Sequence, residues 1–160
     1  MNIMNIFRLG LMVLLIGVYT GCKDDNDGDD NNTLEEGWTC NIWSGTGNWT
    51  LTKEPGMDIK VEGEWFYEFG PEFGNISISC PFTVGTATVN GSSIALDVSG
   101  TAFVEGDTGN TSAFELTVTG TTSNGSGEGL YSITFDDPLW LGTISGDWTG
   151  SRINGSGITN

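Results

Sequence analysis

The stretch that decides the fold is residues 61–69, which read Val-Glu-Gly-Glu-Trp-Phe-Tyr-Glu-Phe. The odd-numbered positions are apolar or small and the even-numbered positions are mostly acidic. Successive side chains of a β-strand point to opposite faces, and such alternation is typical of an antiparallel sheet with one buried and one solvated side. The stretch therefore predicts a strand on which Trp65 and Tyr67 share the buried face.

The same period of two recurs along the rest of the chain, separated by turn residues, and no segment has the period of a helix. Asn90-Gly91 predicts a type I′ hairpin, and Asn124-Gly125 marks another turn. The expected strands are Trp38–Trp43, Asn48–Lys53, Asp58–Phe69, Asn75–Phe82, Thr86–Val89, Ser93–Val98, Thr101–Val104, Ala113–Gly120, Gly129–Phe135, Thr143–Trp148 and Ile153–Thr159. We predict one all-β domain over residues 37–160, a single antiparallel β-barrel or β-sandwich of about 8 to 11 short strands. Strands that run to the end of the chain favour a barrel.

Composition and charge exclude several classes of function. The 160 residues carry 21 Asp+Glu against 5 Lys+Arg, a formal charge of −16, which argues against nucleic-acid binding. The chain has no histidine, so the usual general base and the commonest metal ligand are both missing. Acidic side chains near Glu64 could supply a glycosidase pair, but a solvated sheet face predicts the same residues. We expect no enzyme activity, catalytic residue, metal or cofactor.

The first residues suggest export. The uncharged run at residues 9–18 follows Arg8 and suits the apolar part of a signal peptide, being shorter than the roughly twenty residues that span a bilayer. Tyr19-Thr20-Gly21-Cys22 then resembles the lipobox of bacterial lipoproteins. That resemblance implies that residues 1–21 are removed as a signal peptide and that Cys22 carries lipid.

The residues after Cys22 form a polar, acidic stretch that cannot bury apolar surface, so we expect residues 22–36 to be a disordered tether. Lys23 followed by several aspartates resembles the export signal of surface lipoproteins from Bacteroidota. The resemblance implies a small lipoprotein of this type, held in the outer membrane and exposed at the cell surface, or otherwise on the periplasmic face. It implies no activity for the β domain.

With Cys22 assigned to lipid, Cys40 and Cys80 remain as an even pair. Each lies at an alternating apolar position, and an oxidising compartment favours their pairing. We therefore predict a Cys40–Cys80 disulfide, the alternative being two buried free thiols.

Aromatic side chains supply the candidate ligand-binding residues, namely Trp65, Tyr67 and Trp140. Exposed rings beside carboxylates are what sugar rings stack upon, although Trp65 and Tyr67 equally suit a core. Trp140 falls in an expected loop and is the better candidate for exposure. We expect a membrane-anchored, non-catalytic binding module for a glycan or a small hydrophobic ligand. The alternative is a structural or protein-interaction lipoprotein without a small-molecule site. A barrel cavity or an exposed aromatic strip would favour the binding module, and a filled core would favour the alternative.

Overall fold

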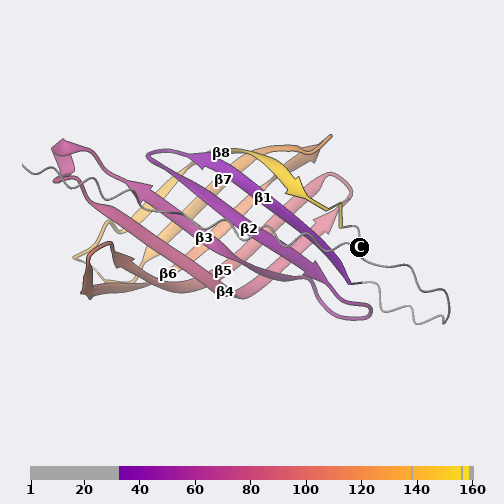
Figure 1. Ribbon diagram of the computed structural model, residues 1–160, viewed down its shortest axis with the longest axis horizontal. Helices are drawn as coiled ribbons and strands as arrows, with labels where there is room; N and C mark the ends of the chain where they lie inside the picture. The colour runs from indigo at the N-terminus through magenta and orange to yellow at the C-terminus, as the bar shows by residue number, and fades with distance from the viewer. Residues whose placement is uncertain (1–32, 138, 156, 159–160) are drawn as a thin grey trace, which may run out of the picture.

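A computed structural model of the chain describes residues 33–137, 139–155 and 157–158. Within these ranges, eight antiparallel strands form a closed barrel, and one short 3-10 helix, η1, lies in the connection between β3 and β4 (Figure 1). The elements are β1 (Leu34–Ile42), β2 (Gly45–Lys53), β3 (Lys60–Glu68), η1 (Pro71–Phe73), β4 (Ser77–Asn90), β5 (Ser93–Val104), β6 (Asp107–Ser123), β7 (Ser126–Phe135) and β8 (Thr143–Asn154). The predicted all-β fold is confirmed, and the barrel rather than the sandwich is present. The predicted signal peptide and Cys22 lie outside the described residues.

Each strand pairs with the next one along the chain, and β1 also pairs with β8 to close the barrel. Because the strands alternate in direction, β1 begins and β8 ends at the same end, which we call the terminal end. The β1–β2, β3–β4, β5–β6 and β7–β8 connections lie at the opposite end, which we call the mouth (left in Figure 1). β1 begins at Leu34, so the domain starts three residues before the predicted boundary at Gly37.

Eight strands replace the eleven expected segments because three expected breaks fall within continuous strands. In β4 the register shifts between Phe82 and Val84, and Gly85 has a φ of 157°. In β5, a Cβ added to Gly100 would lie 2.9 Å from the ring of Phe114 and closer still to backbone. Gly85 therefore lies at a bulge in β4, and Gly100 lies where two strands approach closely. In the sequence alone, a glycine with either role looks like a turn signal. The third break lay between residues 148 and 153, which β8 spans.

The predicted hairpin at Asn90-Gly91 is present, but its turn is of another type. Asn90 pairs with Ser93, so Gly91 and Ser92 are the two central residues, and only Gly91 has a positive φ, of 59°. A positive φ at the first central position alone fits type II′. The β6–β7 turn has the features of type I′, since Asn124 and Gly125 have φ values of 52° and 78°.

Aromatic rings fill the interior of the barrel. Trp49 stacks on Trp38 and Trp65 with ring centroids 6.3 and 6.2 Å away, and its ring meets that of Trp148 edge-on at 5.4 Å. Small residues make room for these rings, since a Cβ added to Gly47 would lie 2.6 Å from the Trp65 ring. An eight-stranded barrel is just wide enough for side chains to fill. The described side chains therefore make the interior a packed core.

A buried carboxylate closes the terminal end. Glu36, which is 5% exposed, accepts hydrogen bonds from the indole N–H of Trp38 at 2.5 Å and the backbone N–H of Ile158 at 2.7 Å. The Arg152 Nη1 atom lies 3.9 Å from the second carboxylate oxygen. A buried carboxylate needs such partners. Through them, Glu36 of β1 is joined to Arg152 of β8 and to Ile158, which follows β8.

The predicted Cys40–Cys80 disulfide is wrong, because both residues are buried free thiols. Cys40 pairs with Gly47, Gly47 with Trp65 and Trp65 with Cys80, so the cysteines are three strand spacings apart. At about 4.8 Å per spacing, the path around the wall is roughly 14 Å, whereas a disulfide needs Cα atoms within about 7 Å. The two cysteines share the interior but not a contact.

Candidate binding surface at the barrel mouth

The structure separates the three predicted ligand-binding residues. Trp65 and Tyr67 are neighbours on β3 and are fully buried in the interior, where their rings pack against other core residues. Neither ring is available as a surface platform for a sugar. Trp140 lies apart from them in the β7–β8 loop at the mouth, half-buried against the core.

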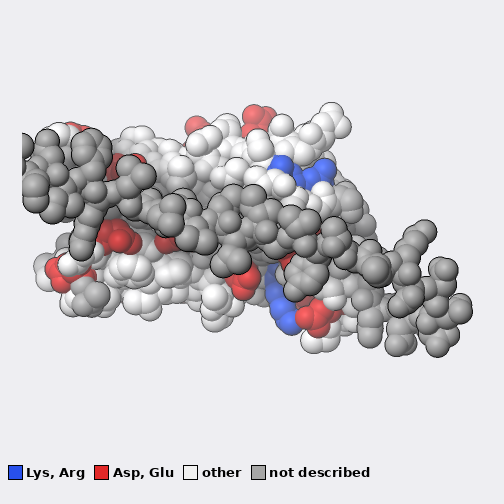
Figure 2. All heavy atoms as spheres, viewed as in Figure 1, with Lys and Arg blue, Asp and Glu red and all other residues white. Residues whose placement is uncertain are grey.

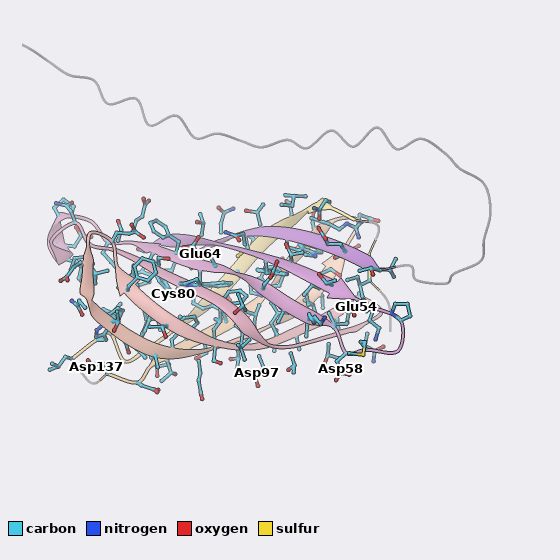
Figure 3. The ribbon with its side chains drawn as sticks, turned by 60° about the horizontal axis from the view of Figure 1, so that its bottom comes forward. Glu54, Asp58, Glu64, Cys80, Asp97 and Asp137 are labelled. Atoms are coloured by element: carbon cyan, nitrogen blue, oxygen red, sulfur yellow. The ribbon has the colours of Figure 1, made fainter. Side chains whose placement is uncertain are left out.

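Hydrogen bonds hold the β7–β8 loop, and so position Trp140. The Asp137 carboxylate accepts the backbone N–H of Leu139 at 2.8 Å, and the Asp137 N–H donates to the hydroxyl of Ser112 on β6 at 3.1 Å. An aspartate that binds its own backbone two residues on makes a compact turn. The Trp140 ring then packs on Phe135 with centroids 5.4 Å apart. Figure 3 shows Asp137 at the mouth, far from Glu54 and Asp58 at the terminal end.

Beside Trp140 lies a pocket of about 350 Å³, which we call the mouth pocket. Its polar lining residues are Asn110 and Asp137, and its apolar ones are Ile76, Ile78, Val104, Leu139, Trp140 and Leu141. The β3–β4 connection, the starts of β4 and β6, the end of β5 and the β7–β8 loop all contribute, so the pocket spans much of the mouth. Its size is at the lower end of the range for small-molecule sites, and a mostly apolar lining with few polar groups is usual for them.

Further apolar side chains at the mouth face the solvent. Leu139 is 92% exposed, and Trp43 and Phe73 are about half exposed. Trp43 and Phe73 both contact the buried ring of Phe69, with centroids 5.9 and 5.6 Å away. We call the exposed set the mouth surface, and it consists of Trp43, Phe73, Ile76, Leu139 and Leu141.

The exposure of Trp43 was not predicted from the sequence, because the alternating pattern includes Trp43 as the last residue of an expected strand. The structure places Trp43 and Ser44 in the tight β1–β2 turn, where Ser44 has a φ of 53°. The Ser-Gly pair that follows Trp43 is a turn signal that could have moved this tryptophan out of the strand.

Two other depressions, of about 390 and 440 Å³, lie on the outer wall of β6, β7 and β8. They flank Leu130, which is 60% exposed, and their other lining residues are mainly threonine, serine, glycine and acidic side chains. The mouth pocket differs because six apolar side chains from separate connections and strands converge on it. We therefore take the mouth as the candidate binding surface.

Burial disfavours the charged forms of the cysteine and tyrosine side chains in the interior. Burial raises the pKa of both the Cys40 and the Cys80 thiol to about 12. Burial also raises the pKa of the Tyr67 and Tyr131 hydroxyls. Among the described residues, no three His, Cys, Asp or Glu side chains gather to hold a metal ion.

The part of the chain that the structure describes also contains no helix long and apolar enough to cross a bilayer.

Comparison with known proteins gives no relative for this chain: no protein family model, no curated protein and no solved structure matches it.

Proposed function

We propose that this protein is a lipid-anchored, extracytoplasmic, non-catalytic binding module that takes apolar groups of its ligand into the mouth pocket. The observation that carries the proposal is the convergence of six apolar side chains, including Trp140, on a pocket of about 350 Å³. Ile76, Leu139 and Leu141 are exposed, and exposed apolar residues that lie together on a soluble protein often mark a binding site.

The path of the chain supports a mouth that faces away from the membrane. Leu34 begins β1 at the terminal end, so a tether from a lipidated Cys22 reaches the barrel on the side opposite the mouth. Two or three acyl chains on Cys22 would anchor the protein stably, because each buried CH₂ contributes about 0.8 kcal/mol. A binding surface at the far end of the barrel is then open to solvent.

The packing of the barrel favours a surface site over an internal one. Trp49, Trp65 and Trp148 occupy the interior and are at most 1% exposed. Within the mouth pocket, Asp137 already binds the N–H of Leu139, which leaves Asn110 as the other polar lining residue for sugar hydroxyls. An apolar ligand group is therefore a better fit to the mouth pocket than a glycan.

The pocket is tested with N-phenyl-1-naphthylamine, a neutral apolar dye whose fluorescence rises on leaving water. We expect saturable binding to the mature protein, weakened at least tenfold by Trp140→Ala. Leu130→Ala is the matched control, since Leu130 is an exposed apolar residue on the outer wall, and it should leave binding unchanged. Circular dichroism verifies that each variant is folded. Absence of saturable binding, or equal binding by the Trp140→Ala variant, would contradict the proposal.

The anchor has a separate test. Metabolic labelling with a radioactive fatty acid should mark the wild-type protein and not the Cys22→Ser variant. Equal labelling of both would refute lipidation at Cys22 and leave the pocket proposal to be judged on the dye alone.

A further inference from the structure

We infer that the partner of the mouth is a protein segment that combines apolar with basic side chains. The inference rests on the proposed function, because it names the kind of molecule whose apolar groups the mouth pocket receives. It also depends on the charge of the side chains around the mouth, which was not used in the argument for the pocket.

Charge is distributed unevenly between the two ends of the barrel. The Lys and Arg residues of the described chain are Lys53, Lys60 and Arg152, and all three lie at the terminal end (Figure 2, right). Lys60 is paired with Glu54 at 2.8 Å, and Arg152 lies beside Glu36. No Lys or Arg in the described part of the chain reaches the mouth.

The mouth instead carries six carboxylates on its connections and strand ends, namely Glu68, Glu72, Glu105, Asp107, Asp136 and Asp137. All but Asp137 are exposed. They lie on the β3–β4, β5–β6 and β7–β8 sides, so they are spread over three of the four sides of the mouth rather than gathered at one edge. We call these six carboxylates the acidic rim. Charged and polar residues commonly border the apolar part of a protein interface.

The apolar part is larger than a small ligand would cover. Ile76 and Leu139 line the mouth pocket, whereas Trp43 and Phe73 lie outside it and remain about half exposed. A ligand confined to about 350 Å³ would leave those two rings in water. An extended peptide can place one apolar side chain in the pocket and others on the two rings. Tryptophan is also among the residues that most often carry the binding energy of a protein interface.

The rim then selects the charge of the partner. Opposite charges across an interface speed association and fix its orientation, while like charges exclude wrong partners. Six carboxylates without a nearby described cation disfavour an acidic partner and also an anionic lipid surface, and they favour lysine or arginine beside the apolar anchors. The mouth surface and its acidic rim are thus complementary to a basic, amphipathic protein segment.

The test uses a fluorescein-labelled twelve-residue peptide of alternating lysine and leucine, measured by fluorescence anisotropy with the mature protein. Two further peptides replace lysine by aspartate or leucine by serine. We expect the lysine-leucine peptide to bind, each replacement to weaken binding at least tenfold, and salt at 0.5 M to weaken it several-fold because screening reaches exposed charges.

Matched variants locate the binding. Glu72→Gln with Asp136→Asn removes two charges at the mouth, and Asp97→Asn with Glu115→Gln removes two from the exposed outer wall of β5 and β6. The mouth pair should weaken peptide binding at least fivefold and the wall pair less than twofold. Leu139→Ser should weaken it at least tenfold, and Leu130→Ser should not.

Five outcomes overturn the inference. Equal effects of the two charge pairs would mean that the peptide senses only net charge. Unchanged binding by the Leu139→Ser variant would remove the apolar anchor. Binding of the dye without the peptide would reject a basic protein partner while leaving the proposed function intact, whereas failure of both probes would reject both. Capture of the protein by phosphatidylcholine vesicles through Leu139 would assign the mouth to a lipid surface instead.

Discussion

The two ends of this barrel differ in where their polar and apolar side chains lie. At the terminal end, Glu36 is buried and satisfied by Trp38, Ile158 and Arg152, so polar groups lie inside with their partners. At the mouth, Leu139 and Trp43 lie outside without a cover, and the carboxylates around them are exposed. The difference indicates that the terminal end contributes to stability, whereas the mouth carries the surface that we propose for binding, although one continuous set of strands builds both.

The largest expected effect on stability is at the terminal end. Glu36→Ala would leave the Trp38 indole N–H and the Ile158 amide buried without an acceptor, so we expect the free energy of unfolding to fall by about 3 kcal/mol. Urea denaturation followed by tryptophan fluorescence measures it. Glu36→Gln keeps a carbonyl acceptor and should lose about half as much. A loss below about 1 kcal/mol for Glu36→Ala would show that the terminal end is not the stabilising one.

The interior between the two ends should respond nearly as strongly. A Cβ added by Gly47→Ala would meet the Trp65 ring at 2.6 Å and the Cys40 sulfur at 2.8 Å, so the rings must shift. Overpacking of this kind costs about 1 to 3 kcal/mol. Gly109→Ala is the control, because the nearest atom to its added Cβ is 3.5 Å away. Equal urea midpoints for the two variants would contradict a tightly filled interior.

Alkaline pH should weaken the same interior by a comparable amount. In the folded protein the pKa of the Cys40 and Cys80 thiols is about 12, against 9.0 for a free thiol. Above pH 9 the unfolded chain therefore binds fewer protons than the folded one, and stability falls as pH rises towards 12. From pH 9 to 10 we expect a loss of about 2 kcal/mol for the two thiols together. Cys40→Ala should remove about 1 kcal/mol of that loss, and an unchanged slope would mean that the Cys40 thiol is in contact with water.

The smallest effect on stability is expected at the mouth. Leu139 is 92% exposed, so Leu139→Ser should change the free energy of unfolding by less than about 0.5 kcal/mol while weakening peptide binding at least tenfold. The same urea titration and anisotropy assay measure both quantities. A loss of stability comparable to that of Gly47→Ala would mean that the loop is part of the core, and the contrast between the ends would fail.

Local patterns in the sequence predicted local structure well. The alternation over residues 61–69 placed Val61, Trp65 and Tyr67 on one face, and all three are buried inside the barrel. Such a pattern depends only on the two faces of a single strand. The loop position of Trp140 followed in the same way, from the Asp-Asp-Pro sequence before it.

Features that depend on distant residues could not be predicted. Glu36 was assigned to an acidic tether, because its burial depends on Arg152 and on Ile158, 122 residues further along. The Cys40–Cys80 prediction failed for the same reason, since matching faces do not give the distance around a closed wall. The mouth pocket combines residues from Ile76 to Leu141, which only the closed barrel brings together.

The pairing of β1 with β8 has a consequence for when this protein can fold. Seven of the eight strand contacts join neighbours along the chain, and only this one joins the first strand to the last. A chain that crosses a membrane in order, amino end first, would keep two unpaired sheet edges until Thr143–Asn154 had emerged. During that interval the open sheet is exposed to aggregation, so any factor that shields nascent edges outside the cytoplasm should raise the yield of closed barrels.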